Sequence, residues 1–347
     1  MRKFVLALGL LLGVIFIISR FTEVQNIFNT LQKGNIKFIF LALLVEAVWI
    51  INLGWTYRAI YRIMGMEGSV KQLMVVAISS NFVNVVTPTA GMSAIAVFIS
   101  DARSKGYSQA RAMVAFALNL LFDYVAFLCV LVLGLVVLIR RNHLQWPEIF
   151  ASIIILVGVV CLASLLYLGL RSGNALGNVL TWLAKLINKL FWPFIRRSYL
   201  EVDRAHTFAS DAADGVSALR QNPRGLIKPL SLAILNKVLL ITIFMLTFLT
   251  FQVPFSAGTI IAGFSVGYLF VIVSPTPSGI GIVEGVLTLT LTSLWVPVED
   301  AAIITLVYRG FTFWLPLFVG MFAFRHFSIA GPSPENKGNS DPILPNN

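Results

Sequence analysis

The chain has 347 residues, of which 58% are hydrophobic and 12% are charged, and its mean hydropathy is +0.86. Soluble domains carry about 25% charged residues, so this composition excludes an ordinary water-soluble enzyme and indicates an integral membrane protein. The 26 Lys and Arg residues outnumber the 15 Asp and Glu residues, which gives a net charge of +11. Most of these bases lie between apolar runs, where they orient helices and contact anionic headgroups, so we expect no nucleic-acid partner.

The apolar runs predict an all-α, polytopic membrane bundle of about eight spanning helices. The first run lacks a small-residue cleavage site, so we expect it to be retained as a helix rather than removed as a signal peptide. Residues 1–327 form the predicted transmembrane domain, and residues 328–347 are rich in Pro, Ser, Asn and Gly, which predicts a disordered tail. The predicted spans are residues 4–19, 38–55, 73–100, 112–139, 149–170, 230–252, 257–296 and 301–324.

Two of these spans are interrupted by proline and glycine. The span 73–100 is broken at 87–91, and the span 257–296 is broken at 274–281. Proline removes a backbone donor and glycine relaxes the backbone, so both breaks are predicted to be turns within the membrane, with Pro88, Pro275 and Pro277 at the bends. We therefore expect two re-entrant hairpins.

The charges of the loops favour these hairpins over single crossings. With hairpins, the basic loop 58–71 and the long basic segment 171–229 both face the cytoplasm, as the positive-inside rule requires. Both termini are then cytoplasmic and the protein is a multi-pass protein of the cell membrane. Within the basic segment, residues 179–197 have the pattern of an amphipathic helix, which either lies on the anionic leaflet or packs on neighbouring helices.

The predicted topology contains two similar units of opposite orientation. Each unit is a helix, a broken hairpin and a second helix, and the hairpin tips VTPTAG and VSPTPSG resemble each other. An inverted repeat with broken helices is the arrangement of many secondary transporters, whose site lies near the midplane between the repeats. The similarity is short, so a chance likeness of two Pro/Gly turns is the alternative.

Five ionisable residues remain inside the apolar spans, where each charge costs about 2.5 to 3.5 kcal/mol on an insertion scale. They are Glu46, Asp123, Lys237, Glu284 and Arg309, and Lys237 lies close enough to one end of its span to extend toward water. One interpretation is a polar chamber between the repeats. The other is a set of interhelical ion pairs, such as Glu46 with Arg309, that only holds the bundle together.

The breaks suggest a site for an anion. A half-helix begins after each turn, and its free backbone amides and positive dipole end can receive a phosphate. The alternative is that proline and glycine only shape re-entrant loops that bind no ligand. The predicted substrate-binding residues are Glu46, Asn81, Asn84, Thr87, Gly91, Ser93, Asp123, Ser278, Gly279, Gly281, Glu284 and Arg309.

Motifs for other chemistries are absent from the sequence. Neither Cys129 nor Cys161 has a partner spacing typical of a disulfide or metal site, and the three histidines are scattered, so we expect no metal and no cofactor. Nucleotide-binding and hydrolase motifs are also absent, and the segment 171–229 is too small for a transferase domain. We therefore do not expect an enzyme in this chain.

The motifs around both breaks resemble those of the lysylphosphatidylglycerol synthase and flippase family. The matching sequences are NFVNVVTPTAG from Asn81, SDAR from Ser100, AFALNLLFDY from Ala115, SPTPSGIGIVEG from Ser274 and YRG from Tyr308. In full-length members, the resemblance implies, a lipid-translocating membrane domain is joined to a cytoplasmic domain that transfers an aminoacyl group from tRNA to phosphatidylglycerol. The resemblance covers the membrane domain, so we expect the translocase-like part and no aminoacyl transfer by this chain.

The predicted function is translocation of a phospholipid or another polar-headgroup lipid between leaflets. The expected partners are membrane phospholipids, anionic or aminoacylated, together with a synthase encoded on another chain if one exists. Three alternatives remain: the membrane subunit of a lipid-modifying enzyme, an ion-coupled exporter of a small solute, and a scaffold.

Overall fold

The computed structural model describes residues 21–87, 92–171, 177–179, 181–182 and 223–330, and these are helical with short connections. The predicted span 4–19, most of the amphipathic segment 179–197 and most of the tail lie outside these residues. The α-helices are α2 (Phe21–Leu31), α3 (Ile36–Ile63), α4 (Val70–Val86), α5 (Met92–Ser104), α6 (Gln109–Arg140), α7 (Trp146–Arg171), α10 (Ile227–Thr250), α11 (Ala257–Val273), α12 (Ile282–Ser293), α13 (Val298–Arg309) and α14 (Leu315–Ala330).

Three short segments of other helix types lie between these α-helices. A 3₁₀ turn, η1 (Pro223–Leu226), precedes α10, and a second one, η2 (Pro277–Gly279), lies in the second break. The segment η3 (Gly310–Trp314) is a π-helix that joins α13 to α14, so the predicted last span is one helical run with a local bulge. Within the described residues there is no β-strand, which confirms the all-α prediction.

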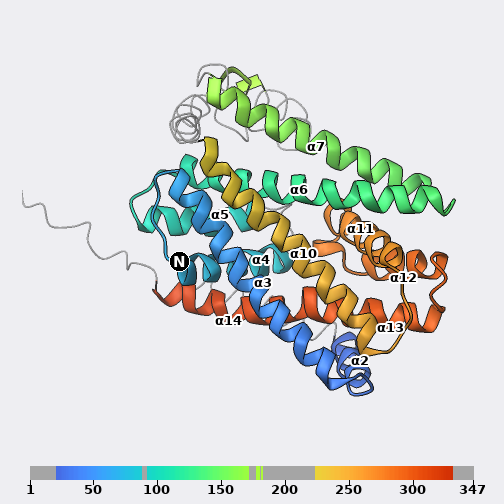
Figure 1. The fold of residues 1–347 in the computed structure, drawn as a ribbon. Coiled ribbons are helices and arrows are strands. Elements are labelled where there is room, and N and C mark those ends of the chain that lie inside the picture. Colours follow the sequence, from blue (N-terminus) through green and yellow to red (C-terminus); the bar gives the residue numbers. More distant parts are fainter. Residues whose placement is uncertain (1–20, 88–91, 172–176, 180, 183–222, 331–347) are drawn as a thin grey trace, which may run out of the picture.

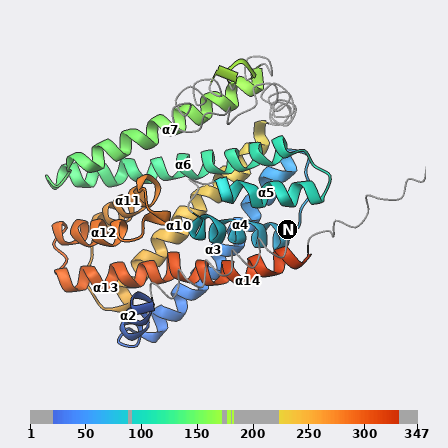
Figure 2. The ribbon, with the colours of Figure 1, turned by 180° about the vertical axis from the view of Figure 1, so that it is seen from behind.

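The surface of the bundle is apolar where a bilayer would surround it. Five helical runs in the described part of the chain are long and apolar enough to cross a membrane. The helix α7 lies at the periphery beside α6 (Figures 1 and 2) and exposes a row of large apolar side chains. A soluble protein would bury such a row, whereas lipid tails solvate it at no cost.

Both broken spans are hairpins, as predicted, and they enter the bundle from opposite ends (Figure 1). The two ends of the α4–α5 hairpin meet where the backbone N–H of Glu67 donates to the Tyr107 hydroxyl at 2.9 Å. The two ends of the α11–α12 hairpin meet beside the α6–α7 connection, where Ala262 and Leu294 pack against Leu138. We call these the α5 end and the α12 end of the bundle.

The packing between the two units is reciprocal. The first helices of the units, α3 and α10, pack along each other, α4 of the first unit packs on α14 of the second, and α11 of the second packs on α6 of the first. The alignment that places Pro88 on Pro275 also places Ile78 of α4 on Ser265 of α11. Ile78 and Ser265 each pack against a glycine of the opposite unit. This reciprocity is what an inverted repeat produces.

These two glycines let the backbones of the crossing helices approach closely. A Cβ atom on Gly134 of α6 would overlap the side chain of Ser265, and one on Gly320 of α14 would lie 2.8 Å from the carbonyl oxygen of Ile78. The Ser265 hydroxyl also donates to the Val130 carbonyl at 3.1 Å across the same crossing. Small residues at helix crossings are the usual means of close packing in membranes.

We expect Gly134→Ala to lower the free energy of unfolding by about 1 to 3 kcal/mol, because α6 and α11 would have to separate. Gly158→Ala on α7 is the matched control, since a Cβ atom there meets nothing within 4 Å. Equilibrium unfolding in detergent micelles measures both variants. Equal stabilities for the two variants would contradict the close crossing.

Candidate functional site

The turn between α11 and α12 is held by Arg309. The Arg309 Nε atom donates to Glu284 Oε1 at 2.7 Å, and its NH2 group donates to the carbonyl oxygen of Ser278 at 3.0 Å. Arg309 is 3% exposed, and its guanidinium also lies 4.6 Å from the centre of the Phe313 ring. One arginine thus ties α13 to both the turn and the half-helix that follows it.

The start of the half-helix α12 is capped by the carboxylate of Glu284. Glu284 Oε2 accepts the backbone N–H of Gly281 at 2.6 Å, so this carboxylate occupies the positive dipole end where the sequence predicts a ligand phosphate. Ser278 has a left-handed backbone, with φ 51°, and Gly279 is buried. Pro277 begins the 3₁₀ turn η2, and Pro275 is exposed. An incoming phosphate would have to join or displace Glu284.

The first break is described on both sides of its turn. The hydroxyl of Ser93, at the start of α5, donates to the carbonyl oxygen of Thr87 at 3.1 Å, so Ser93 closes the turn. Asn81 is exposed on α4 and Asn84 is half-buried. Pro88 and Gly91 lie outside the described residues, so their predicted roles as bend and anion contact stay predictions.

The turn of the second hairpin packs against the end of α4, the first helix of the other hairpin. The η2 turn contacts α4, and Ile280 lies in one apolar cluster with Phe82, Val85 and Val86 at the end of α4. The second break and the end of α4, far apart in the sequence, are therefore neighbours in the interior of the bundle. This contact is the arrangement that a site shared between two hairpins requires.

A second polar cluster joins α6, α10 and α11. The Lys237 ammonium lies 2.6 Å from Asp123 Oδ1 and 2.6 Å from the Tyr268 hydroxyl, and Tyr268 in turn donates to Asp123 Oδ2 at 3.0 Å. Asn236 adds a longer hydrogen bond, 3.5 Å, to the same carboxylate. Lys237 is 0% exposed and does not extend to water, because Asp123 and Tyr268 bind its ammonium inside the bundle.

The Asp123 cluster continues toward α3 along one face of α6. Asn119 lies one turn before Asp123, as the sequence indicates, and its amide donates to the Tyr57 hydroxyl at 3.0 Å. Two hydrogen-bonded groups, one joining α6 to α3 and the other joining α6 to α10 and α11, therefore lie one helical turn apart on α6. Such groups inside a membrane domain are costly unless they are paired, and here the charged groups of Asp123 and Lys237 are paired with each other.

Glu46 is the exception among the buried charges. It is 0% exposed, and neither of its carboxyl oxygens has a hydrogen-bond partner in the described part of the chain. The pairing of Glu46 with Arg309 that the sequence suggested is therefore wrong, because Arg309 is bonded to Glu284 and Ser278. The Tyr308 hydroxyl lies within electrostatic reach of Glu46 and of Arg309.

Sequence reasoning did not include Tyr57, Asn236 or Tyr268 in the site. Tyr268 lies in the second half of the largely apolar helix α11, and Asn236 directly precedes Lys237 in α10. A search for uncharged polar groups on the helix faces that carry Asp123 and Lys237 would have found both. Among the described residues, no three His, Cys, Asp or Glu side chains are close enough together to hold a metal ion.

Two comparisons bear on the identity of the chain. No curated protein shows significant similarity to it. The family model described as lysylphosphatidylglycerol synthase TM region matches residues 4–320, which include both hairpins and every charged residue of the two clusters. The chain therefore belongs to the lysylphosphatidylglycerol synthase transmembrane region family, which indicates a membrane protein linked to lipid modification or flipping.

Proposed function

We propose that this protein moves a phospholipid, or another lipid with a polar headgroup, between the two leaflets of the cell membrane. The observation that carries the proposal is the contact between two hairpins that enter from opposite ends. The η2 turn lies next to the start of α12 and to the polar groups of Arg309 and Glu284, so a headgroup passing between η2 and the end of α4 would exchange water for protein donors and acceptors. The acyl tails would remain in lipid.

The charged groups of the two clusters suit the parts of such a headgroup. Arg309 uses two of its N–H donors on the chain itself, which leaves further N–H groups of its guanidinium for a phosphate. An amine on the headgroup would be received by Glu46, whose carboxyl oxygens have no hydrogen-bond partner among the described residues, or by Asp123 and Glu284 when their partners move. The half-helix end after Gly91 would add backbone donors, and the end after Gly279 would add them where the phosphate joins or displaces Glu284.

The buried ion pairs stabilise the closed bundle until a substrate offers replacement partners. A buried pair is held only while both partners stay together, and breaking it costs several kcal/mol unless a new partner replaces the old one. A headgroup that carries both a phosphate and an amine could supply replacement partners to Arg309 and Asp123 together. Entry of the substrate would thus offset the cost of opening the bundle.

Reconstitution tests the proposal. Purified protein in liposomes should move fluorescent phosphatidylglycerol, or an aminoacylated lipid, between leaflets faster than protein-free liposomes do, as measured with a quencher confined to one leaflet. The expected acceleration is at least about tenfold, which equals about 1.4 kcal/mol of barrier. No acceleration with anionic and amine-bearing lipids, with and without a proton gradient, would overturn the proposal.

The same preparation separates the other candidates. Substrate-induced currents or uptake of a water-soluble compound, without lipid movement, would identify an exporter of small solutes. A soluble enzyme that co-purifies and modifies lipids only in the presence of this chain would identify the membrane subunit of a lipid-modifying enzyme. Lipid movement by the isolated chain supports the translocase and requires neither of these.

A further inference from the structure

A cavity of about 900 Å³ opens at the α5 end of the bundle, between the end of α3 and the hairpin α4–α5. Two arginines of α3, Arg58 and Arg62, line it one helical turn apart, and Lys105 lines it from the end of α5. The buried side chain of Met66 forms part of the wall. We call this cavity the basic pocket, and it is separate from the Asp123 and Arg309 clusters.

Among the residues that the structure describes, basic side chains around the basic pocket outnumber acidic ones. Lys105 is paired with Asp101 at 2.8 Å, and the exposed Glu67 also lines the pocket. Neither Arg58 nor Arg62 has an ion-pair partner in the part of the chain that the structure describes. Two like charges at positions i and i+4 of a helix repel each other, so an anion between them would be stabilising.

Arg58 in particular has an unused donor. Its Nε atom is buried and has no hydrogen-bond partner among the described residues. Its guanidinium lies 5.5 Å from the centre of the Trp55 ring, and the Lys228 ammonium lies 5.7 Å from the centre of the same ring. A buried N–H without an acceptor is costly, and a ligand oxygen would satisfy it.

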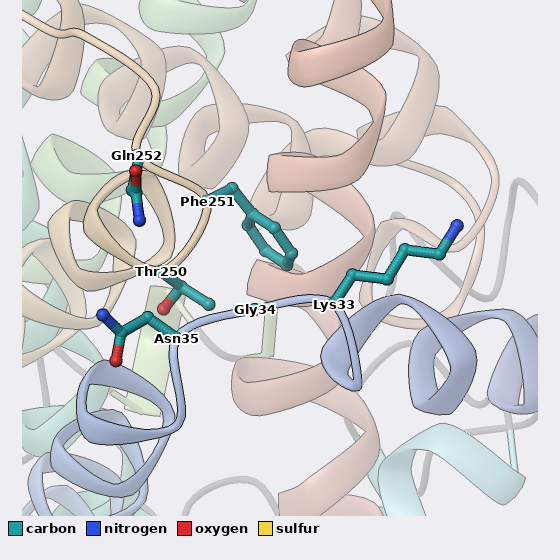
Figure 3. Close-up of a pocket in the computed structure, with 6 residues that line it drawn as sticks. All are labelled: Lys33, Gly34, Asn35, Thr250, Phe251 and Gln252. Atoms are coloured by element: carbon teal, nitrogen blue, oxygen red, sulfur yellow. The ribbon is translucent and has the colours of Figure 1, made fainter.

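The cavity at the opposite end of the bundle provides a contrast. It measures about 380 Å³ and lies between the α2–α3 connection and the end of α10 (Figure 3). Lys33 is its one charged lining residue, and in Figure 3 this side chain extends away from Asn35 and Thr250. The backbone N–H of Asn35 is already bonded to the Thr250 carbonyl at 2.9 Å. This smaller cavity therefore has fewer positive charges and donors for an anion than the basic pocket has.

We propose that the basic pocket binds a phosphate group, with the guanidinium groups of Arg58 and Arg62 as its principal donors. Arginine presents planar pairs of N–H groups that match two phosphate oxygens, and it holds its charge at any physiological pH. The half-exposed Trp55 beside Arg58 is a side chain typical of the membrane interface. This position favours the phosphodiester of an anionic phospholipid, although inorganic phosphate has the same chemistry.

Binding to purified protein in detergent tests this site without any transport. The ligands are dioctanoyl phosphatidylglycerol, dioctanoylglycerol, which lacks the phosphate, and inorganic phosphate, and the readout is the rise in unfolding temperature with ligand concentration. We expect the phospholipid to stabilise the wild-type protein and dioctanoylglycerol not to do so. A response to inorganic phosphate at the same concentrations would identify a free anion as the ligand and would equally support the phosphate site.

Two matched double variants separate the pocket from general surface charge. Arg58→Gln/Arg62→Gln should weaken binding at least about tenfold, because it removes the principal donors. Lys71→Gln/Arg103→Gln removes two exposed charges from neighbouring helices that do not line the pocket and should leave binding within about twofold. Arg62→Gln alone, at an exposed position, supplies the measurement if the first double variant does not fold.

Equal weakening by both double variants would overturn the proposal, since it would show that only net charge matters. The same holds if dioctanoylglycerol stabilises the protein as strongly as phosphatidylglycerol, or if no phosphate-bearing ligand stabilises it. None of these outcomes bears on lipid movement. The phosphate site can therefore be disproved while the proposed translocation stands, and the proposed translocation can be disproved while the phosphate site stands.

Discussion

Replacing Asp123 with Leu is expected to destabilise the protein by about 3 kcal/mol, because it leaves Lys237 charged, fully buried and without its carboxylate partner. Lys237→Met should destabilise by a similar amount, since it leaves Asp123 without its cation. The double variant Asp123→Leu/Lys237→Met should lose less than about 1 kcal/mol, because no unpaired charge remains. Equilibrium unfolding in micelles measures all three.

The double variant also distinguishes function from scaffolding. If the pair only holds α6 and α10 together, an apolar pair of similar volume can do the same, and every activity should persist. If the pair receives a headgroup, the protein should fold and fail to move lipid. Additive destabilisation by the two single substitutions would contradict the direct pairing of Asp123 with Lys237.

Arg309→Lys is expected to reduce lipid movement at least about tenfold, although it preserves the charge. The guanidinium bonds Glu284 and the carbonyl oxygen of Ser278 from two different nitrogen atoms, and a lysine ammonium cannot reproduce that geometry. The turn between α11 and α12 would lose one tether, and the carboxylate at the start of α12 would lose the cation that fixes it.

Arg325→Lys is the matched control for this substitution. Arg325 lies on the same helical run but is exposed near the end of α14. Its conversion to lysine should leave lipid movement within about twofold of the wild-type rate. Lipid movement by Arg309→Lys at the wild-type rate, in protein that unfolds like the wild type, would remove Arg309 from the translocation path.

The sequence predicts the helices and both hairpins well because hydropathy and proline are local signals. The predicted span 38–55 ends too early, since Arg58 and Arg62 lower the hydropathy while the helix itself continues to Ile63. The helix α2 was not predicted, because it is short and partly polar, and it is positioned by the contact of Ile27 with Gly310. The π-helix η3 depends on tertiary packing and leaves no local signal.

The members of the candidate site were easier to predict than their pairing. Buried charges stand out in apolar spans, and four of the five that the sequence indicates form two ion pairs. Which acid meets which base depends on helix crossings between residues far apart in the sequence. Glu284 lies in the first helical turn of α12, close to the η2 loop that Arg309 contacts. Glu46 instead lies on α3, which packs mainly against α10 and α4.

The rate of lipid movement between leaflets, measured in the same liposomes for wild type and for Asp123→Leu/Lys237→Met, tests the proposed function most directly. We predict that the wild-type rate exceeds that of protein-free liposomes at least about tenfold. The double variant should fold and unfold like the wild type, yet fall to the protein-free rate. A double variant that moves lipid at the wild-type rate, or a wild type that moves none, would contradict a lipid path lined by these buried charges.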